Sequence, residues 1–201
     1  MSFRWEITSA VLRQGIIAIV RTPSTDLAIE AAVPLLDAGI TSLELPLTNP
    51  GALAAIEFLS RTYPRATIGA GTVLDETSAV LAIRAGARFL VSPNLEPSVI
   101  RAAHRHGAAA LPGAATVTEI VHALEAGADA VKVFPAPTPR WVQDVRAALP
   151  HAPLVPTGGI APEEVSAWLA AGAVACGVGS ALARTPIDTI RTLIRTHEVN
   201  S

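Results

Sequence analysis

Short apolar runs alternate with longer alanine-rich segments along almost the whole chain. Five of the alanine-rich segments end in a glycine, and an apolar run of strand length follows each; the glycines are Gly39, Gly86, Gly107, Gly127 and Gly172. A glycine at this place is typical of the left-handed residue that ends a helix. The repeating unit is therefore helix, glycine, strand, and it recurs about every 22 residues when the two longest gaps are halved.

Eight apolar runs fit this repeat as strands. They lie at 16–20, 41–45, 66–70, 88–92, 108–111, 129–134, 153–157 and 174–178. A helix-like segment follows each strand, and residues 3–13 predict one more helix before the first; the eight are 24–37, 51–61, 75–85, 95–106, 116–126, 139–148, 162–171 and 187–197. Ser24 before Asp26, and Thr116 three positions before Glu119, are typical of helix starts.

Strands that alternate with helices predict parallel βαβ units, and eight such units predict a (β/α)8 TIM barrel. We therefore expect an α/β fold with this barrel and an N-terminal helix, in a single domain that spans residues 1–201. A doubly wound open sheet is the main alternative. The length is at the small end for such a barrel, so the loops must be short and a second domain does not fit.

Composition and charge exclude several classes of protein. Half of the residues are apolar, the formal net charge is −2, and the one cysteine, Cys176, excludes a disulfide framework and a cysteine metal cluster. The five histidines show no ligand spacing, so we expect no metal. Scattered arginines give neither a nucleic-acid stripe nor a membrane patch. Glu6 and Arg13 interrupt the segment where a signal peptide would lie, so we expect a cytoplasmic protein without a membrane span.

The sequence contains 14 arginines but only one lysine, Lys132, within the apolar run AVKVFPA. An amine can lose its proton and act as a nucleophile, which a guanidinium cannot do in practice. Strand side chains alternate between two faces, so Lys132 points into the barrel if Val131 and Val133 pack under the helices. The same alternation turns Glu44 inward between its two leucine neighbours. The pattern thus directs one amine and one carboxylate into a common interior.

An amine and a carboxylate in one dry interior predict Schiff-base chemistry. Burial disfavours the charged ammonium, so we expect a neutral amine that attacks a ketone. The resulting iminium withdraws electrons from an adjacent carbon–carbon bond, and Glu44 is the best candidate for the proton transfers. Two other interpretations remain open. The ammonium of Lys132 could reach solvent at the strand end, or the two groups could form an ion pair without a catalytic role.

Two glycine turns follow the last two predicted strands, PTGGI and GVGSAL. Their exposed backbone N–H groups can hold a phosphate, which barrels often bind after strands 7 and 8. The residues concerned are Gly158, Gly159, Gly179 and Ser180. Simple turn formation is the alternative, because glycine turns are common.

Eight segments, in order along nearly the whole chain, carry a resemblance to a known family: IIAIVR, AGITSLELPLTNP, IGAGTVL, AGARFLVSPN, LPGAATVTEI, ALEAGADAVKVFPA, PTGGI and GVGSAL. The chain resembles the KDPG/KDPGal aldolases, class I aldolases of 2-keto-3-deoxy-6-phospho sugar acids. The resemblance implies a (β/α)8 barrel, usually a homotrimer. It also implies cleavage of the phosphorylated keto acid to pyruvate and D-glyceraldehyde 3-phosphate, without a metal or another cofactor.

The resemblance also implies roles by position. Lys132 would form the Schiff base, and Glu44 would be the general acid/base. The other matched positions would bind substrate: Arg21, Thr72, Pro93, Phe134, Gly158, Gly159, Gly179 and Ser180.

One departure distinguishes two branches of the family. Gluconate-type members carry an arginine after the catalytic glutamate, as in E-V-T-L-R-T, whereas this chain reads ELPLTNP with Thr48 there. That segment is closer to E-I-P-L-N-S-P of the galactonate type, and it leaves Arg21 as the expected partner of the substrate carboxylate. We therefore expect cleavage of 2-dehydro-3-deoxy-6-phosphogalactonate or its gluconate epimer. A phosphate-binding barrel isomerase or epimerase, and a non-catalytic ligand-binding barrel, are the alternatives.

Overall fold

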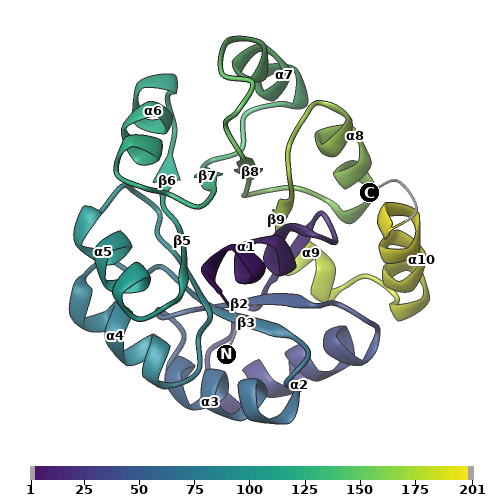
Figure 1. Ribbon diagram of the computed structural model, residues 1–201. Coiled ribbons are helices and arrows are strands. Elements are labelled where there is room, and N and C mark those ends of the chain that lie inside the picture. The colour runs from purple at the N-terminus through teal and green to yellow at the C-terminus, as the bar shows by residue number, and fades with distance from the viewer. Residues whose placement is uncertain (1–2, 199–201) are drawn as a thin grey trace.

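Parallel strands form the centre of the protein and helices surround them (Figure 1). The computed structural model describes residues 3–198, so residues 1–2 and 199–201 of the expected 1–201 domain lie outside the described part. The strands are β1 (Ile16–Ile19), β2 (Ser42–Pro46), β3 (Thr67–Gly71), β4 (Phe89–Val91), β5 (Ala109–Leu111), β6 (Gly113–Ala114), β7 (Val131–Val133), β8 (Leu154–Pro156) and β9 (Cys176–Val178).

Nearly all of the helices follow the predicted repeat. They are α1 (Arg4–Leu12), α2 (Thr25–Asp37), α3 (Ala52–Thr62), α4 (Glu76–Arg84), α5 (Pro97–Arg105), α6 (Val117–Glu125), α7 (Pro139–Ala148), α8 (Val165–Ala170), α9 (Ser180–Ala183) and α10 (Ile187–Glu198), with a 3-10 turn η1 (Pro162–Glu164). The side chains of Ser24 and Thr116 accept hydrogen bonds at the starts of α2 and α6, as predicted. Within residues 3–198, no helix has the length and apolarity needed to cross a membrane.

The strands pair in two parallel sheets with the orders β5-β4-β3-β2-β1-β9 and β6-β7-β8. Pro112 separates β5 from β6 because it has no N–H to donate, but its carbonyl still accepts from the N–H of Lys132 at 2.9 Å. Between β8 and β9, the N–H of Val174 donates to the carbonyl of Leu154 at 3.0 Å, and Thr157 forms a parallel bridge with Gly177. The α/β class with parallel strands is thus confirmed, and the sequential strand order differs from that of a doubly wound sheet.

Apolar side chains pack in two clusters, one on each face of the strands. The larger cluster lies between the strands and the outer helices, and it holds the fully buried Leu43, Leu45 and Val133. The smaller cluster lies on the inner face, where Phe89 and Val155 are among the strand residues. The alternation predicted for β2 and β7 therefore places the aliphatic side chains outward, as expected.

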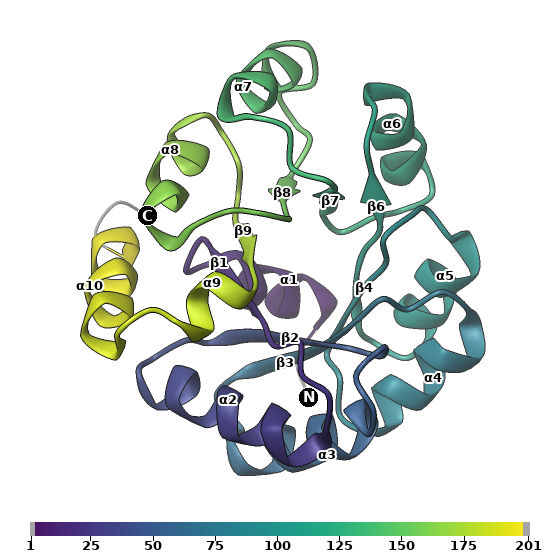
Figure 2. The same ribbon diagram turned by 180° about the vertical axis from the view of Figure 1, so that it is seen from behind.

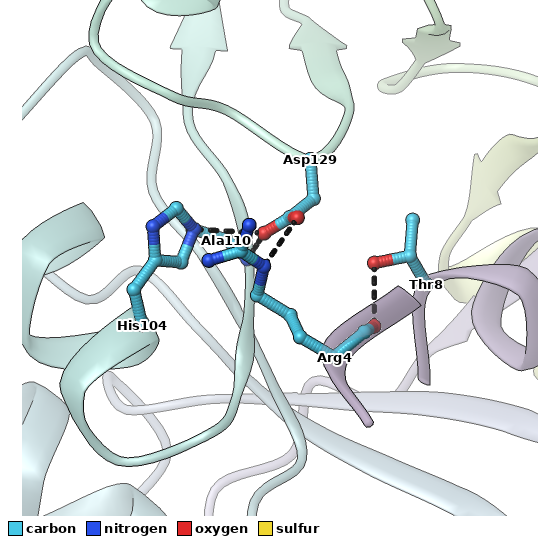
Figure 3. A network of polar contacts seen from close by, with 5 residues as sticks. All are labelled: Arg4, Thr8, His104, Ala110 and Asp129. Carbon is cyan, nitrogen blue, oxygen red and sulfur yellow. Dashed lines mark hydrogen bonds and ion pairs between the residues drawn. The ribbon is translucent and has the colours of Figure 1, made fainter. Parts of the chain in front are cut away.

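Helix α1 lies across the inner face at one end of the strands and contacts β1 to β5 (Figures 1 and 2). Its side chains Ile7 and Val11 belong to the inner cluster. Arg4 of α1 lies 3.0 Å from the carboxylate of Asp129, which also accepts from the N–H of Ala110 at 2.9 Å (Figure 3). Nε2 of His104 is 3.0 Å from the same carboxylate. One carboxylate thus joins α1, α5, β5 and the loop before β7.

Three short features differ from the predicted elements. The helix expected at 162–171 begins as η1 and continues as α8. The two-residue strand β6 was not predicted, and neither was the short helix α9 after β9. Its four residues, SALA, are too few to show a helical period of apolar positions.

We expect the substitution Asp129→Ala to destabilise the fold by roughly 1–3 kcal/mol, because it removes the acceptor of the part-buried Ala110 N–H and two further contacts. Urea unfolding of the variant measures this change. Glu57→Ala is the matched control, since it breaks only an exposed ion pair with Arg61 and should change the midpoint little. Equal shifts in both variants would contradict the role given to Asp129.

Candidate active site

A cavity of about 760 Å³ lies at the carboxyl ends of the strands, away from α1. All ten residues singled out from the sequence line it: Arg21, Glu44, Thr72, Pro93, Lys132, Phe134, Gly158, Gly159, Gly179 and Ser180. They come from β2 and β7 and from the segments that follow β1, β3, β4, β7, β8 and β9. The parallel strands bring them together because all of their carboxyl ends face the same side.

Lys132 and Glu44 are both buried polar side chains in this cavity, with exposed fractions of 8% and 3%. The amine of Lys132 lies 5.1 Å from the ring centroid of Phe134. Between the two side chains there is no ion pair within 4.0 Å, and no other described residue forms a hydrogen bond with either polar end. The burial of Lys132 disfavours the interpretation that its ammonium merely reaches solvent. The separation between Lys132 and Glu44 disfavours a purely structural ion pair. Both groups therefore remain available to a ligand.

Burial raises the pKa of Glu44 above its ordinary value of 4.5, because the ionised carboxylate loses hydration inside the protein. The positive charges of Lys132 and Arg21 act in the opposite direction and only partly compensate. A carboxyl group with a raised pKa can hold a proton closer to neutral pH. Glu44 is thus suited to both release and accept a proton beside the amine.

Glu44 fits into the interior because the neighbouring strand carries glycine. A Cβ atom on Gly71 of β3 would overlap Oε1 and Cδ of Glu44, and one on Gly69 would overlap the ring of Phe89. The segment GAG therefore leaves room for two inward side chains of adjacent strands. Its role was missed in the sequence, because the glycines meet these side chains only after β3 pairs with β2 on one side and with β4 on the other.

The segment after β2 holds Arg21 in place from two sides. Nη1 of Arg21 donates to Oγ1 of Thr48 at 2.8 Å. The buried side chain of Asn49 donates to the carbonyl of Val20 at 2.8 Å and accepts from the N–H of Thr22 at 3.3 Å. Thr48 thus contacts the arginine side chain, while Asn49 fixes the backbone on both sides of it. Sequence reasoning did not find Asn49, because its partners lie 27 and 29 residues away.

The backbone at Thr72 is strained. Its φ of 55° lies in the left-handed region, which is unfavourable for a β-branched residue. Such strain persists only where the surrounding structure holds it, and it is often found at ligand sites. Thr72 lines the cavity directly after β3, consistent with a position constrained by a binding role.

The glycine turns form another part of the cavity wall. Gly158 and Gly159 have φ of 106° and 72°, a conformation that favours glycine. No described residue accepts a hydrogen bond from the N–H groups of Gly158, Gly159, Gly179 or Ser180. These donors are therefore available to an anion. Arg184 lines the same cavity, and sequence reasoning missed it because the preceding helix, α9, was not predicted.

The sequence comparisons with known proteins give one consistent family. Residues 7–192 match the family described as "Aldolase: KDPG and KHG aldolase". The 2-dehydro-3-deoxy-6-phosphogalactonate aldolase of Escherichia coli (strain K12) is 38% identical over 181 residues, which are 88% of this chain and 88% of that protein.

Solved structures agree with the sequence matches. The structure described as "Native KDPGal structure" is 34% identical, with a TM-score of 0.79 over 92% of each chain. The KDPG aldolase from Legionella pneumophila, with pyruvate captured as a covalent carbinolamine intermediate, is 28% identical. Its TM-score is 0.75, over 100% of this chain and 98% of that one.

Within residues 3–198 of this chain, no group of three His, Cys, Asp or Glu side chains is placed to hold a metal ion.

We expect Gly71→Ala to lower the rate of pyruvate release about 100-fold with little change in stability, because the new methyl group displaces the flexible carboxyl of Glu44. A coupled pyruvate assay and urea unfolding measure the two effects. Ala70→Gly is the matched control on the same strand, since Ala70 packs in the outer cluster. It should lower stability by about 1 kcal/mol and retain activity. Full activity of Gly71→Ala would show that Glu44 tolerates another position.

The raised pKa of Glu44 predicts a pH dependence of stability. Between the unfolded and folded pKa values the folded state binds more protons than the unfolded state, so this group lowers stability as pH rises. Its favourable contribution is fully present below the unfolded value and is lost as pH rises through the folded pKa. The unfolding free energy of the wild type should therefore fall relative to Glu44→Gln as the pH rises above the ordinary value of 4.5. Urea unfolding at several pH values measures the difference in unfolding free energy between the two proteins. A difference that does not change with pH would contradict the raised pKa of Glu44.

Proposed function

This chain belongs to the KDPG and KHG aldolase family, and we propose that it is a class I aldolase of a 2-keto-3-deoxy-6-phospho sugar acid. The products would be pyruvate and D-glyceraldehyde 3-phosphate. One observation carries the proposal: the only lysine of the sequence is buried in the cavity that also holds Glu44 and the two glycine turns.

The reaction follows from an amine and a proton carrier in one enclosed space. The amine of Lys132 attacks the C2 ketone, and the carbinolamine loses water to give an iminium. Glu44 takes the proton of the C4 hydroxyl, the C3–C4 bond breaks, and its electron pair moves into the iminium to give an enamine. The aldehyde leaves with the phosphate. Protonation at C3 and addition of water then release pyruvate and restore the free amine.

The substrate carries negative charge at both ends, and the cavity offers donors for each. We assign the carboxylate to Arg21, whose side chain is held by Thr48. The phosphate is assigned to the free N–H groups of Gly158, Gly159, Gly179 and Ser180. Thr72, Pro93 and Phe134 complete the wall along the carbon chain.

Within the family we propose the galactonate-type substrate. Thr48 stands where the gluconate type has an arginine, and its hydroxyl oxygen accepts a hydrogen bond from Arg21. The epimers differ only in the orientation of the C4 hydroxyl, so discrimination depends on one or two hydrogen bonds. Cleavage rates measured on both epimers test this, and faster cleavage of the gluconate epimer would overturn it.

The finer architecture also belongs to the proposal. We propose that β5 and β6 act as one strand, so that eight strands close a barrel in a single domain. The Thr157–Gly177 bridge and the hydrogen bonds across Pro112 support this closure. The homotrimer and the cytoplasmic location stay predictions.

Borohydride trapping tests the role of Lys132. Reduction in the presence of pyruvate should add a stable mass to the peptide that contains Lys132, because the reduced Schiff base cannot hydrolyse. Mass spectrometry measures it. Lys132→Arg is the matched control: it keeps the charge, should not be labelled at this position, and should lose activity by on the order of 1000-fold or more. Unlabelled wild-type protein would remove the mechanism, and an active Lys132→Arg variant would favour an isomerase.

A further inference from the structure

We propose that Arg184 binds the phosphate of the substrate and sets the preference for phosphorylated over unphosphorylated aldehydes. This inference rests on the proposed function. Arg184 lines the cavity together with the glycine turns after β8 and β9, and neither the family comparison nor the sequence pattern pointed to it.

The fold gives Arg184 a defined direction. Helix α9 lies beside β9 and inside the ring formed by the outer helices (Figure 2). Arg184 is the residue that ends α9, with helical φ and ψ of −100° and −3°. Residues three and four apart lie on one face of a helix, so Arg184 shares the face of Ser180 and Ala181. Both of these residues also line the cavity.

Charge distinguishes Arg184 from the rest of the cavity wall. The charged lining residues are Arg21, Glu44, Lys132 and Arg184. The first three already have parts in the carboxylate site or the chemistry. The other donors assigned to the phosphate are uncharged backbone N–H groups, while a phosphate carries close to two negative charges. Among the described residues that line the cavity, Arg184 is therefore the remaining charged side chain, and its positive charge can compensate the negative charge of the phosphate.

The guanidinium of Arg184 is also unoccupied. Five other arginines form ion pairs with carboxylates: Arg4, Arg61, Arg105, Arg140 and Arg191. The side chain of Arg184 forms no hydrogen bond or ion pair with any residue of the described part. A planar guanidinium matches two phosphate oxygens at once. No protein partner has to be displaced before it binds them.

The test compares Arg184→Ala with the wild type in the aldol direction, with pyruvate and either D-glyceraldehyde 3-phosphate or D-glyceraldehyde. Loss of charge-assisted hydrogen bonds should raise KM for the phosphorylated aldehyde by about 10- to 100-fold. Because the reacting atoms are untouched, kcat and the reaction of D-glyceraldehyde should stay unchanged. Arg184→Lys should recover part of the loss. Arg191→Ala is the matched control, since Arg191 pairs with Asp188 and does not line the cavity.

Inorganic phosphate gives a readout that does not depend on catalysis. Phosphate should raise the Tm of the wild type, and Arg184→Ala should lose most of this shift while Arg191→Ala retains it. Equal changes of KM for both aldehydes, or an unchanged KM with an unchanged phosphate shift, would overturn the role of Arg184. Failure of pyruvate trapping on Lys132 would instead overturn the proposed function, and the phosphate shift would still decide the role of Arg184.

Discussion

The narrow inner face of the parallel strands is the constraint on which the site depends. Every strand directs alternate side chains into one small space, so a large side chain on one strand requires a small residue on its neighbour. Phe89 lies against Gly69, Glu44 against Gly71, and Thr157 against Gly177. The polar side chains in this space are buried, so they lose hydration, and the pKa of Glu44 rises as a result.

The two ends of the strands serve different purposes. At one end, α1 covers the interior with apolar side chains, and the carboxylate of Asp129 satisfies several donors at once. At the other end, donors remain unsatisfied around the cavity, and the backbone of Thr72 is strained. A stable closed end allows the open end to keep groups in an arrangement that favours a ligand rather than the fold itself.

The sequence predicted the elements well because each depends on neighbours within one or two turns of chain. The glycine that ends five of the helices, and the apolar run after each helix, placed eight strands with bounds within two residues of those observed. The capping residues of α2 and α6 were also identified. Two of the departures also have local causes. Pro112 separates β5 from β6 because it lacks an N–H, and α9 is too short to show a period.

By itself, the sequence determined the parallel α/β class and the inward direction of Lys132 and Glu44, because the side chains of a strand alternate between two faces. It also determined which strand ends meet at the cavity, because parallel strands all end on the same side. Only the tertiary structure decided which further residues make room for the cavity residues, hold them in place or lie beside them. Gly71 beside Glu44, Asn49 around Arg21, and Arg184 beside the glycine turns all depend on register or on contacts between distant segments. Such contacts leave no periodic trace in the chain, because each involves a single residue that meets its partner only after folding.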